Sequence, residues 1–398
     1  MKRKPVSHHI KTILMSSILM MSSLSHGASL QLNSNSENND QKKIWPTKEW
    51  PTKPLKESGF NQEKFNKFLD YVWEDEGNFN SDSIVIIKDG NLVYEGYSNG
   101  YTKNKKHMLW SLTKSMTSII MGSALKNKIL DMNDPIHKYF PTLNRKDAED
   151  IKLHHVLNMS SGFDFFEEHP IHDIFSDSVS VYYSRHAYKN VALGVSKLPM
   201  KHKPGTQFKY GTHEPMLAMG ILKKAINNQE VYDNYPWTAV FNKLGMKNVT
   251  FEQDLSGTFM GGAYAHASAR DYAKLGYLLL NKGKWDGEEI LTEEYVDFAI
   301  KKVAPALYIP KKEKKQQRLN VETYGAYFWL NGILPMNENG RPYPAAPEEL
   351  VQAMGFRGQT MGLIPSKNLI IVRLGSDGVY KKIKRNKMYQ LLLASLEE

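Results

Sequence analysis

The chain has 398 residues, of which 41% are hydrophobic and 24% charged, and its formal net charge is +10. This composition excludes disorder of the whole chain, because there are enough apolar side chains to bury a core. The sequence contains no cysteine, which excludes disulfides, a thiol nucleophile, thiolate metal sites and a lipid-modified cysteine.

Residues 1–28 have the pattern of an export signal. Four basic residues come first, an apolar run with four serines follows at residues 13–24, and small residues end the segment at Gly27 and Ala28. The run is shorter than the roughly 20 residues that a membrane span needs, so a cleaved signal is favoured over a membrane anchor. Removal of its four basic residues, with no acidic ones, lowers the net charge from +10 to +6. The mature protein is therefore expected to be periplasmic or secreted.

Residues 29–57 are rich in Asn, Ser, Lys and Pro and have no apolar periodicity, which predicts an extended lead-in to a domain at residues 58–398. Apolar side chains at three- and four-residue spacing predict an amphipathic helix at residues 61–73. Two β-rich runs at residues 83–87 and 92–97 are joined by an Asp-Gly turn and predict an antiparallel hairpin.

Helical patterns dominate the middle of the chain, and strand patterns return near its end. The helical patterns lie at residues 113–125, 214–227, 268–281 and 292–301, the strand patterns at 324–330, 359–364 and 368–374, and a last helix at 382–396. Strands at both ends predict an α+β fold, in which one antiparallel sheet is built from both chain ends and flanked by helices. A mainly helical subdomain is inserted at roughly residues 125–300, and a site is expected between the two parts.

A Ser-x-x-Lys tetrad begins at Ser111, and a second copy begins at Ser123. Their positions differ. Ser111 opens an apolar helix, where backbone N–H groups and the helix dipole favour developing negative charge, whereas Ser123 lies well inside that helix. Residues three apart share a helix face, so the Lys114 amine can accept the Ser111 proton if the amine is neutral.

A neutral lysine requires a lowered pKa, and burial among Met108, Leu109 and Trp110 is the expected cause. The alternative is a capping serine beside a solvated lysine.

Two later segments supply candidate partners for this pair. Tyr210 follows Pro204-Gly205 and precedes a predicted helix, so its phenol is expected on a loop facing the site, where it can pass a proton to the leaving group. Residues 353–359, Ala-Met-Gly-Phe-Arg-Gly-Gln, lead into the penultimate strand, and the Phe356 N–H can join the Ser111 N–H as an oxyanion hole. The alternatives are a packing tyrosine and a glycine-containing turn at an edge strand.

These three elements, in this order, resemble the β-lactamase-related serine hydrolases and are most similar to 6-aminohexanoate-dimer hydrolase and its esterase relatives. The segments 153–162 and 261–271 agree, so the resemblance covers roughly Phe60 to the C-terminus. It implies a penicillin-binding-protein-like fold and acyl-enzyme chemistry, with Ser111 as nucleophile, Lys114 as general base and Tyr210 as its partner. It implies no metal and no organic cofactor.

The chain departs from β-lactamases and D,D-peptidases of this fold at two places. Thr212 stands where they have Asn or Ser, and Ala353-Met354-Gly355 stands where they have Lys-Thr-Gly or His-Thr-Gly. Loss of the strand lysine removes a positive anchor for a substrate carboxylate and disfavours penicillin recognition, with Arg357 as the candidate substitute. The predicted oxyanion and substrate-binding residues are Gly355, Phe356, Arg357, Gly358, Gln359, Thr212, Tyr182 and Tyr183, although core packing is the alternative for the two adjacent tyrosines.

The sequence therefore predicts a serine hydrolase acting on a small-molecule ester or amide. A peptidoglycan D,D-carboxypeptidase or a β-lactamase is the runner-up, and a non-catalytic ligand-binding protein of the same fold is the rival from another class. No nucleic-acid partner is expected, since the basic run at residues 311–315 has the pattern of an exposed loop. No His-Glu-x-x-His metal motif occurs.

Overall fold

The computed structural model describes residues 45–74, 79–167, 177, 189–302, 323–332, 340–378 and 381–397. These residues belong to one compact unit, Ile44–Glu398. The predicted signal, the basic run at 311–315, Tyr182 and Tyr183 lie outside the described residues. None of the described helices is long and apolar enough to cross a bilayer.

The segment before residue 58, where the sequence predicts that the domain begins, already packs on the body of the protein. Trp50 is 5% exposed, and its indole N–H donates to the Arg270 carbonyl at 3.0 Å. Thr52 forms a parallel bridge with Leu92. One buried aromatic side chain in a polar segment produces no periodicity in the sequence. Composition alone therefore does not reveal that the segment before residue 58 packs on the domain.

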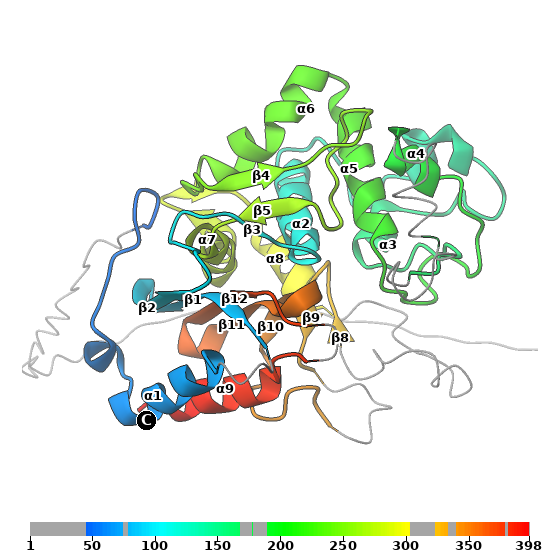
Figure 1. Ribbon diagram of the computed structural model, residues 1–398. Helices are drawn as coiled ribbons and strands as arrows, with labels where there is room; N and C mark the ends of the chain where they lie inside the picture. Colours follow the sequence, from blue (N-terminus) through cyan, green and yellow to red (C-terminus); the bar gives the residue numbers. More distant parts are fainter. Residues whose placement is uncertain are drawn as a thin grey trace, which may run out of the picture. The chain divides into compact units, whose positions relative to one another are not determined.

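A seven-stranded antiparallel sheet lies at the centre of the unit (Figure 1), in the order β2-β1-β12-β11-β10-β9-β8. The strands are β1 Ser81–Lys88, β2 Asn91–Tyr97, β8 Thr323–Tyr324, β9 Trp329–Leu330, β10 Val351–Gly355, β11 Gln359–Ile364 and β12 Leu369–Gly375. Pairing of β1 with β12 joins the first part of the chain to the last. The prediction of an α+β fold with one sheet from both chain ends is confirmed.

Both faces of this sheet are covered by helices, which explains why β1 is apolar at successive positions. Alternate side chains of a strand point to opposite faces. Ile84 and Ile86 belong to the core that includes side chains of α1 (Gln62–Val72) and α9 (Arg385–Ala394). Val85 and Ile87 belong to the core shared with α2 (Leu112–Lys126) and α7 (Ala269–Leu280). In Figure 1 the two helix pairs lie on opposite sides of the sheet.

The remaining helices follow α2 in the chain. They are α3 Leu153–Leu157, α4 Val191–Val195, α5 His213–Ile226, α6 Gln229–Pro236 and α8 Glu293–Ile300. A small sheet in the order β3-β5-β4 joins His107–Met108, Ala265–Ala267 and Val249–Phe251. The predicted helices 113–125, 214–227, 268–281 and 292–301 agree with α2, α5, α7 and α8 to within a residue at each end.

Two strand predictions differ from the structure. The single strand predicted at 324–330 is a tight hairpin of β8 and β9, because the chain turns at Tyr327, whose φ is 63°. The segment 353–359, predicted as a glycine-containing approach to the penultimate strand, begins as part of an additional strand, β10. Its Gln352 is fully buried and accepts from the Tyr389 hydroxyl at 2.8 Å. A buried glutamine and a glycine interrupt the apolar pattern from which strands are predicted.

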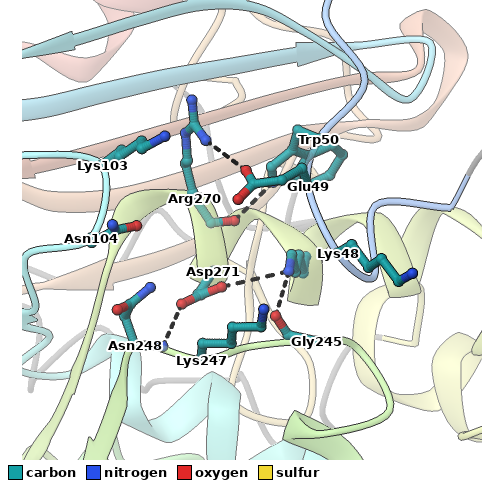
Figure 2. A pocket seen from close by; sticks show the side chains of 11 residues that line it. Lys48, Glu49, Trp50, Lys103, Asn104, Gly245, Lys247, Asn248, Arg270 and Asp271 are labelled. Carbon is teal, nitrogen blue, oxygen red and sulfur yellow. Dashed lines mark hydrogen bonds and ion pairs between the residues drawn. The ribbon is translucent and has the colours of Figure 1, made fainter.

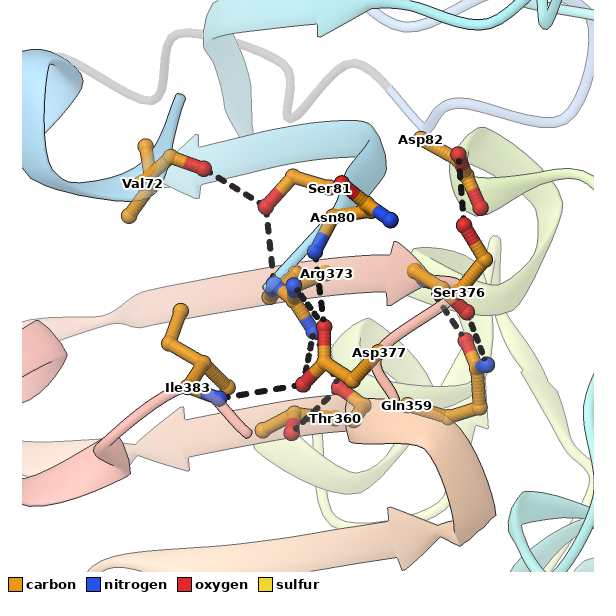
Figure 3. Close-up of polar contacts among 12 residues, drawn as sticks. Val72, Asn80, Ser81, Asp82, Gln359, Thr360, Arg373, Ser376, Asp377 and Ile383 are labelled. Atoms are coloured by element: carbon orange, nitrogen blue, oxygen red, sulfur yellow. Dashed lines mark hydrogen bonds and ion pairs between the residues drawn. The ribbon is translucent and has the colours of Figure 1, made fainter. Parts of the chain in front are cut away.

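A buried ion pair connects the central strands to the turn that follows β10 (Figure 3). Arg373 on β12 donates to Asp377 at 2.6 Å, to the Gly358 carbonyl at 2.9 Å and to the Ser81 hydroxyl at 2.8 Å. Both partners of the pair are fully buried. Asp377 also accepts from the backbone N–H groups of Asn80 and Ile383. The charges are thus compensated by several hydrogen bonds, as burial of an ion pair requires.

Removal of one partner would leave the other charge buried and uncompensated. We therefore expect Asp377→Ala to lower the free energy of unfolding by about 3–5 kcal/mol, measured by urea denaturation. Lys67→Ala, which breaks the exposed Lys67–Glu63 pair, serves as the control and is expected to have little effect. Equal stability of the two variants would contradict this assignment.

Candidate functional site

Ser111 lies at the start of α2, and the segment before it is held by backbone pairing. His107–Met108 pairs with β5, and the Leu109 N–H donates to the Ala265 carbonyl at 2.9 Å. Trp110 then adopts a φ of 50°, an uncommon and strained value for a bulky residue. The half-buried Ser111 side chain makes no capping hydrogen bond with the helix, so the hydroxyl is available for another role.

Lys114 lies one turn further along α2 and is 1% exposed. Its Nζ is 2.9 Å from the Ser111 Oγ, 3.1 Å from the Thr212 Oγ1 and 2.8 Å from the Gly262 carbonyl oxygen. The two tetrad side chains therefore face each other, as their three-residue spacing predicts. Burial lowers the pKa of Lys114 to about 8, which makes the neutral amine accessible near neutral pH.

Apart from Ser111, the hydrogen-bond partners of Lys114 come from segments distant in the chain. Thr212 precedes α5, and Gly262 lies in the segment before β5. A Cβ added to Gly262 would lie 2.0 Å from the Thr212 Cγ2, so only glycine brings this carbonyl close enough to the amine. Thr117 on α2 holds the preceding residue, because its hydroxyl donates to the Gly261 carbonyl at 2.8 Å.

The second tetrad occupies the opposite end of α2. Ser123 is 1% exposed and lies in the helix interior. Its hydroxyl forms a hydrogen bond with Tyr235. Burial raises the pKa of Tyr235, and the hydrogen bonds with Asn127 and Ser123 partly lower it again. The structure thus separates a half-exposed serine beside a buried lysine from a fully buried serine.

Tyr210 lies on the loop before α5, as predicted, and its ring faces Lys114. The lysine Nζ is 5.0 Å from the Tyr210 ring centroid. The ring packs against Trp329 and Tyr324 of the β8–β9 hairpin, with centroid separations of 5.0 Å and 5.9 Å. These two aromatic side chains were not predicted as part of the site, since each is an ordinary core residue in the sequence pattern.

Thr212 and Glu167 form a second layer behind Lys114. The Thr212 hydroxyl donates to the Glu167 Oε1 at 2.6 Å, and the Thr212 backbone N–H donates to the other carboxylate oxygen. Thr212 was predicted to bind substrate, but its buried hydroxyl is directed at Lys114 and Glu167. Glu167 was missed by sequence reasoning, because a single acidic residue after two phenylalanines carries no signal of its partner.

The end of β10 lies beside the loop that leads to Ser111. A Cβ added to Gly355 would lie 2.7 Å from the Leu109 carbonyl oxygen, so glycine permits this close approach. The Phe356 and Trp110 rings meet edge to face, with centroids 5.3 Å apart. The predicted oxyanion partners Ser111 and Phe356 therefore lie on adjoining segments.

The other residues predicted on this segment have different surroundings. Arg357 is exposed, with a φ of 61°. A Cβ on Gly358 would lie 2.2 Å from the Asp377 Oδ2, so this glycine fits around the buried ion pair. Gln359 is fully buried, and its amide pairs with the Gly375 backbone in both directions. Its side chain therefore stabilises the sheet, in contrast to the substrate-binding role predicted for it.

A polar pocket beside Trp50 contains none of the predicted site residues (Figure 2). Two of its cationic side chains, Arg270 and Lys274, are engaged within the protein. Arg270 pairs with Glu49 at 3.1 Å and with Glu95, and Lys274 donates to the Gly245 carbonyl at 2.6 Å. Among the described residues, no group of three or more His, Asp or Glu side chains could hold a metal ion.

Comparisons with known proteins identify a family and a set of related folds. The model of the Beta-lactamase family matches residues 62–394. The 6-aminohexanoate-dimer hydrolase of Paenarthrobacter ureafaciens is 20% identical over 302 residues, which cover 74% of this chain and 72% of the relative.

Two solved structures show the same fold. The octameric penicillin-binding protein homologue from Pyrococcus abyssi has a TM-score of 0.61 at 21% identity, covering 84% of this chain and 78% of that one. EstCE1, a hydrolase with promiscuous acyltransferase activity, has a TM-score of 0.64 at 14% identity, covering 83% of this chain and 98% of that one. The fold expected from the sequence resemblance is confirmed.

The geometry distinguishes the two tetrad serines by reactivity. We expect a fluorophosphonate probe to label Ser111, because only this serine combines an accessible hydroxyl with a neighbouring buried amine. Ser111→Ala is expected to abolish labelling and Ser123→Ala to leave it unchanged, as measured by mass spectrometry of the labelled peptide. Labelling that persists in Ser111→Ala would refute the assignment.

Proposed function

The chain belongs to the beta-lactamase family, and from this premise we propose that it is a serine hydrolase that cleaves a small-molecule ester or amide through an acyl-enzyme on Ser111. One observation carries the proposal. The Ser111 hydroxyl lies 2.9 Å from the amine of a buried lysine whose pKa is about 8. A serine hydroxyl becomes a nucleophile when an adjacent base can take its proton.

In the first half of the reaction, the neutral Lys114 amine accepts the Ser111 proton while Oγ attacks the substrate carbonyl carbon. The carbonyl oxygen becomes an oxyanion that accepts hydrogen bonds from the Ser111 and Phe356 backbone N–H groups. Collapse of this intermediate breaks the bond to the alcohol or amine, which leaves with a proton passed from Lys114 through Tyr210. The acyl group remains on Ser111.

In the second half, water attacks the acyl carbon and gives one proton to the Tyr210–Lys114 pair. The ester bond to Ser111 breaks, Oγ recovers a proton, and the carboxylic acid leaves. The relative EstCE1 is described as a hydrolase with promiscuous acyltransferase activity, which supports an acyl-enzyme that can be attacked by more than one nucleophile.

A linear ester or amide is favoured over a β-lactam or a peptidoglycan stem peptide. The strand β10 beside Ser111 carries Ala353, Met354 and Gly355, so it has no cationic side chain to bind a substrate carboxylate. The exposed Arg357 follows that strand and is the proposed substitute. The proposed place of action is outside the cytoplasm, on the evidence of the signal pattern in residues 1–28.

A non-catalytic ligand-binding role is disfavoured by the buried lysine. Desolvation of an amine is costly, and a binding protein that has no use for a neutral base would gain nothing from keeping Lys114 at 1% exposure. The chain also has a residue for each proposed chemical step: Ser111, Lys114 and Tyr210.

Substrate class can be tested directly. We expect the mature protein to hydrolyse a short-chain p-nitrophenyl ester and a linear anilide faster than a chromogenic cephalosporin, because the strand lacks the lysine anchor. Initial rates are compared by absorbance, with Ser111→Ala as the blank. Rapid cephalosporin turnover with negligible ester hydrolysis would reverse this order.

The pH dependence tests Lys114 as the base. Only the unprotonated amine accepts the Ser111 proton, so kcat/KM for the ester should rise with pH through about 8 and then level off. Lys114→Met is expected to lower kcat/KM by about 100- to 10,000-fold, whereas Lys126→Met, in the second tetrad, should keep the wild-type profile. A profile without a rise in this range would argue against a lysine base.

A further inference from the structure

We propose that Glu167 is a positioning residue that directs the lone pair of Lys114 onto Ser111 by orienting the hydroxyl of Thr212. The inference rests on the proposed function and adds to it a residue that does not touch Ser111. Its basis is a chain of hydrogen bonds from Glu167 through Thr212 to Lys114.

Glu167 decides the direction of the Thr212 hydroxyl. A carboxylate has no proton to donate, so in the contact of 2.6 Å the Thr212 hydroxyl must be the donor. The Thr212 backbone N–H donates to the second carboxylate oxygen, which holds the carboxylate in place at both ends. With its only hydroxyl proton engaged, Thr212 can meet Lys114 solely as an acceptor.

The acceptors around Lys114 then determine where its lone pair points. A neutral amine has two N–H groups and one lone pair. The Gly262 carbonyl at 2.8 Å can only accept, and the oriented Thr212 oxygen at 3.1 Å also accepts. These two partners use both N–H groups, so the lone pair is left facing the Ser111 Oγ at 2.9 Å. This is the arrangement in which the amine can take the serine proton.

Loss of the Glu167 carboxylate would remove this constraint. The Thr212 hydroxyl could then turn its proton toward the lysine lone pair and compete with Ser111 for it. A glutamine at position 167 accepts through only one of its two terminal groups, so it cannot receive both Thr212 donors. The base would spend part of its time engaged with threonine rather than serine.

The charge of Glu167 has a separate effect on the same amine. Burial lowers the pKa of Lys114, and the Glu167 charge partly raises it again. The other titratable groups near the amine are the Tyr210 ring at 5.0 Å and His213, whose burial lowers its pKa to about 3 and keeps it uncharged. Removal of the Glu167 charge should therefore move the acidic limb of the pH profile to lower pH.

The test measures ester hydrolysis against pH in four forms of the mature protein: wild type, Glu167→Gln, Thr212→Val and the double variant. We expect Glu167→Gln to lower kcat on the order of 100-fold through misdirection of the base, and to shift the acidic limb to lower pH. In the Thr212→Val background the same change should shift the limb but lower kcat no further, because no hydroxyl remains to be oriented.

Asp164→Asn is the matched control. It removes a carboxylate from the same segment. That carboxylate is half-exposed, and its ion pair with the exposed Lys201 amine is long, at 3.6 Å. It should leave both kcat and the limb unchanged. The thermal unfolding midpoint of each variant is also measured. A fall in kcat without a fall in this midpoint indicates loss of positioning rather than loss of the fold.

If Glu167→Gln does not fold, Thr212→Ser and Thr212→Val carry the test. The serine variant keeps a hydroxyl and should keep most activity, while the valine variant should not. The inference is overturned if Glu167→Gln behaves as Asp164→Asn does, if the kcat losses in the double variant multiply, or if Thr212→Val matches the wild type. Failure of the wild type itself to hydrolyse any ester or to bind the fluorophosphonate at Ser111 would instead count against the proposed function.

Discussion

The buried amine of Lys114 is the constraint on which the rest of the site depends. An amine removed from water is stable only if its polar hydrogens meet acceptors. Two distant segments supply the acceptors, Thr212 before α5 and Gly262 before β5, while the remaining contact of the amine is with Ser111 on the same helix. Each segment must reach the amine with its backbone or a short side chain, and the close packing of Gly262 on Thr212 is one consequence.

The central sheet contributes to the site through its ends rather than through its apolar centre. β1 and β12 are buried on both faces and lie side by side in the middle of the framework. The Arg373–Asp377 pair on this framework binds the Gly358 carbonyl and therefore holds the turn that begins at Phe356. A charge pair on the sheet thus helps to determine where the end of β10 lies relative to Ser111.

The two departures from the family pattern act at different places. Thr212 stands where the related enzymes have Asn or Ser, and its hydroxyl contacts the Lys114 amine, with Glu167 as an additional partner. Ala353-Met354-Gly355 removes a cation from the strand next to the nucleophile. With threonine at position 212, the Lys114 amine still has a hydroxyl acceptor. The change on β10 removes a positive charge that could bind a substrate carboxylate.

Local patterns in the sequence were sufficient to predict these helices and strands and the contact between Ser111 and Lys114. The hairpin of β1 and β2 follows from two β-rich runs around Asp89-Gly90, and α2, α5, α7 and α8 follow from apolar periodicity. Ser111 and Lys114 face each other because they are three residues apart on one helix. Each of these features depends on residues that are close in the chain.

Tertiary structure alone decided the surroundings of that pair. Thr212 and Gly262 meet Lys114 across 98 and 148 residues of chain, Glu167 enters from yet another loop, and Trp50 is buried by contact with Arg270. Gln359, read from its motif as a substrate ligand, is instead enclosed by the sheet. Burial and hydrogen-bond partners depend on how distant segments pack. Local periodicity contains no information about which distant segment packs against a given residue.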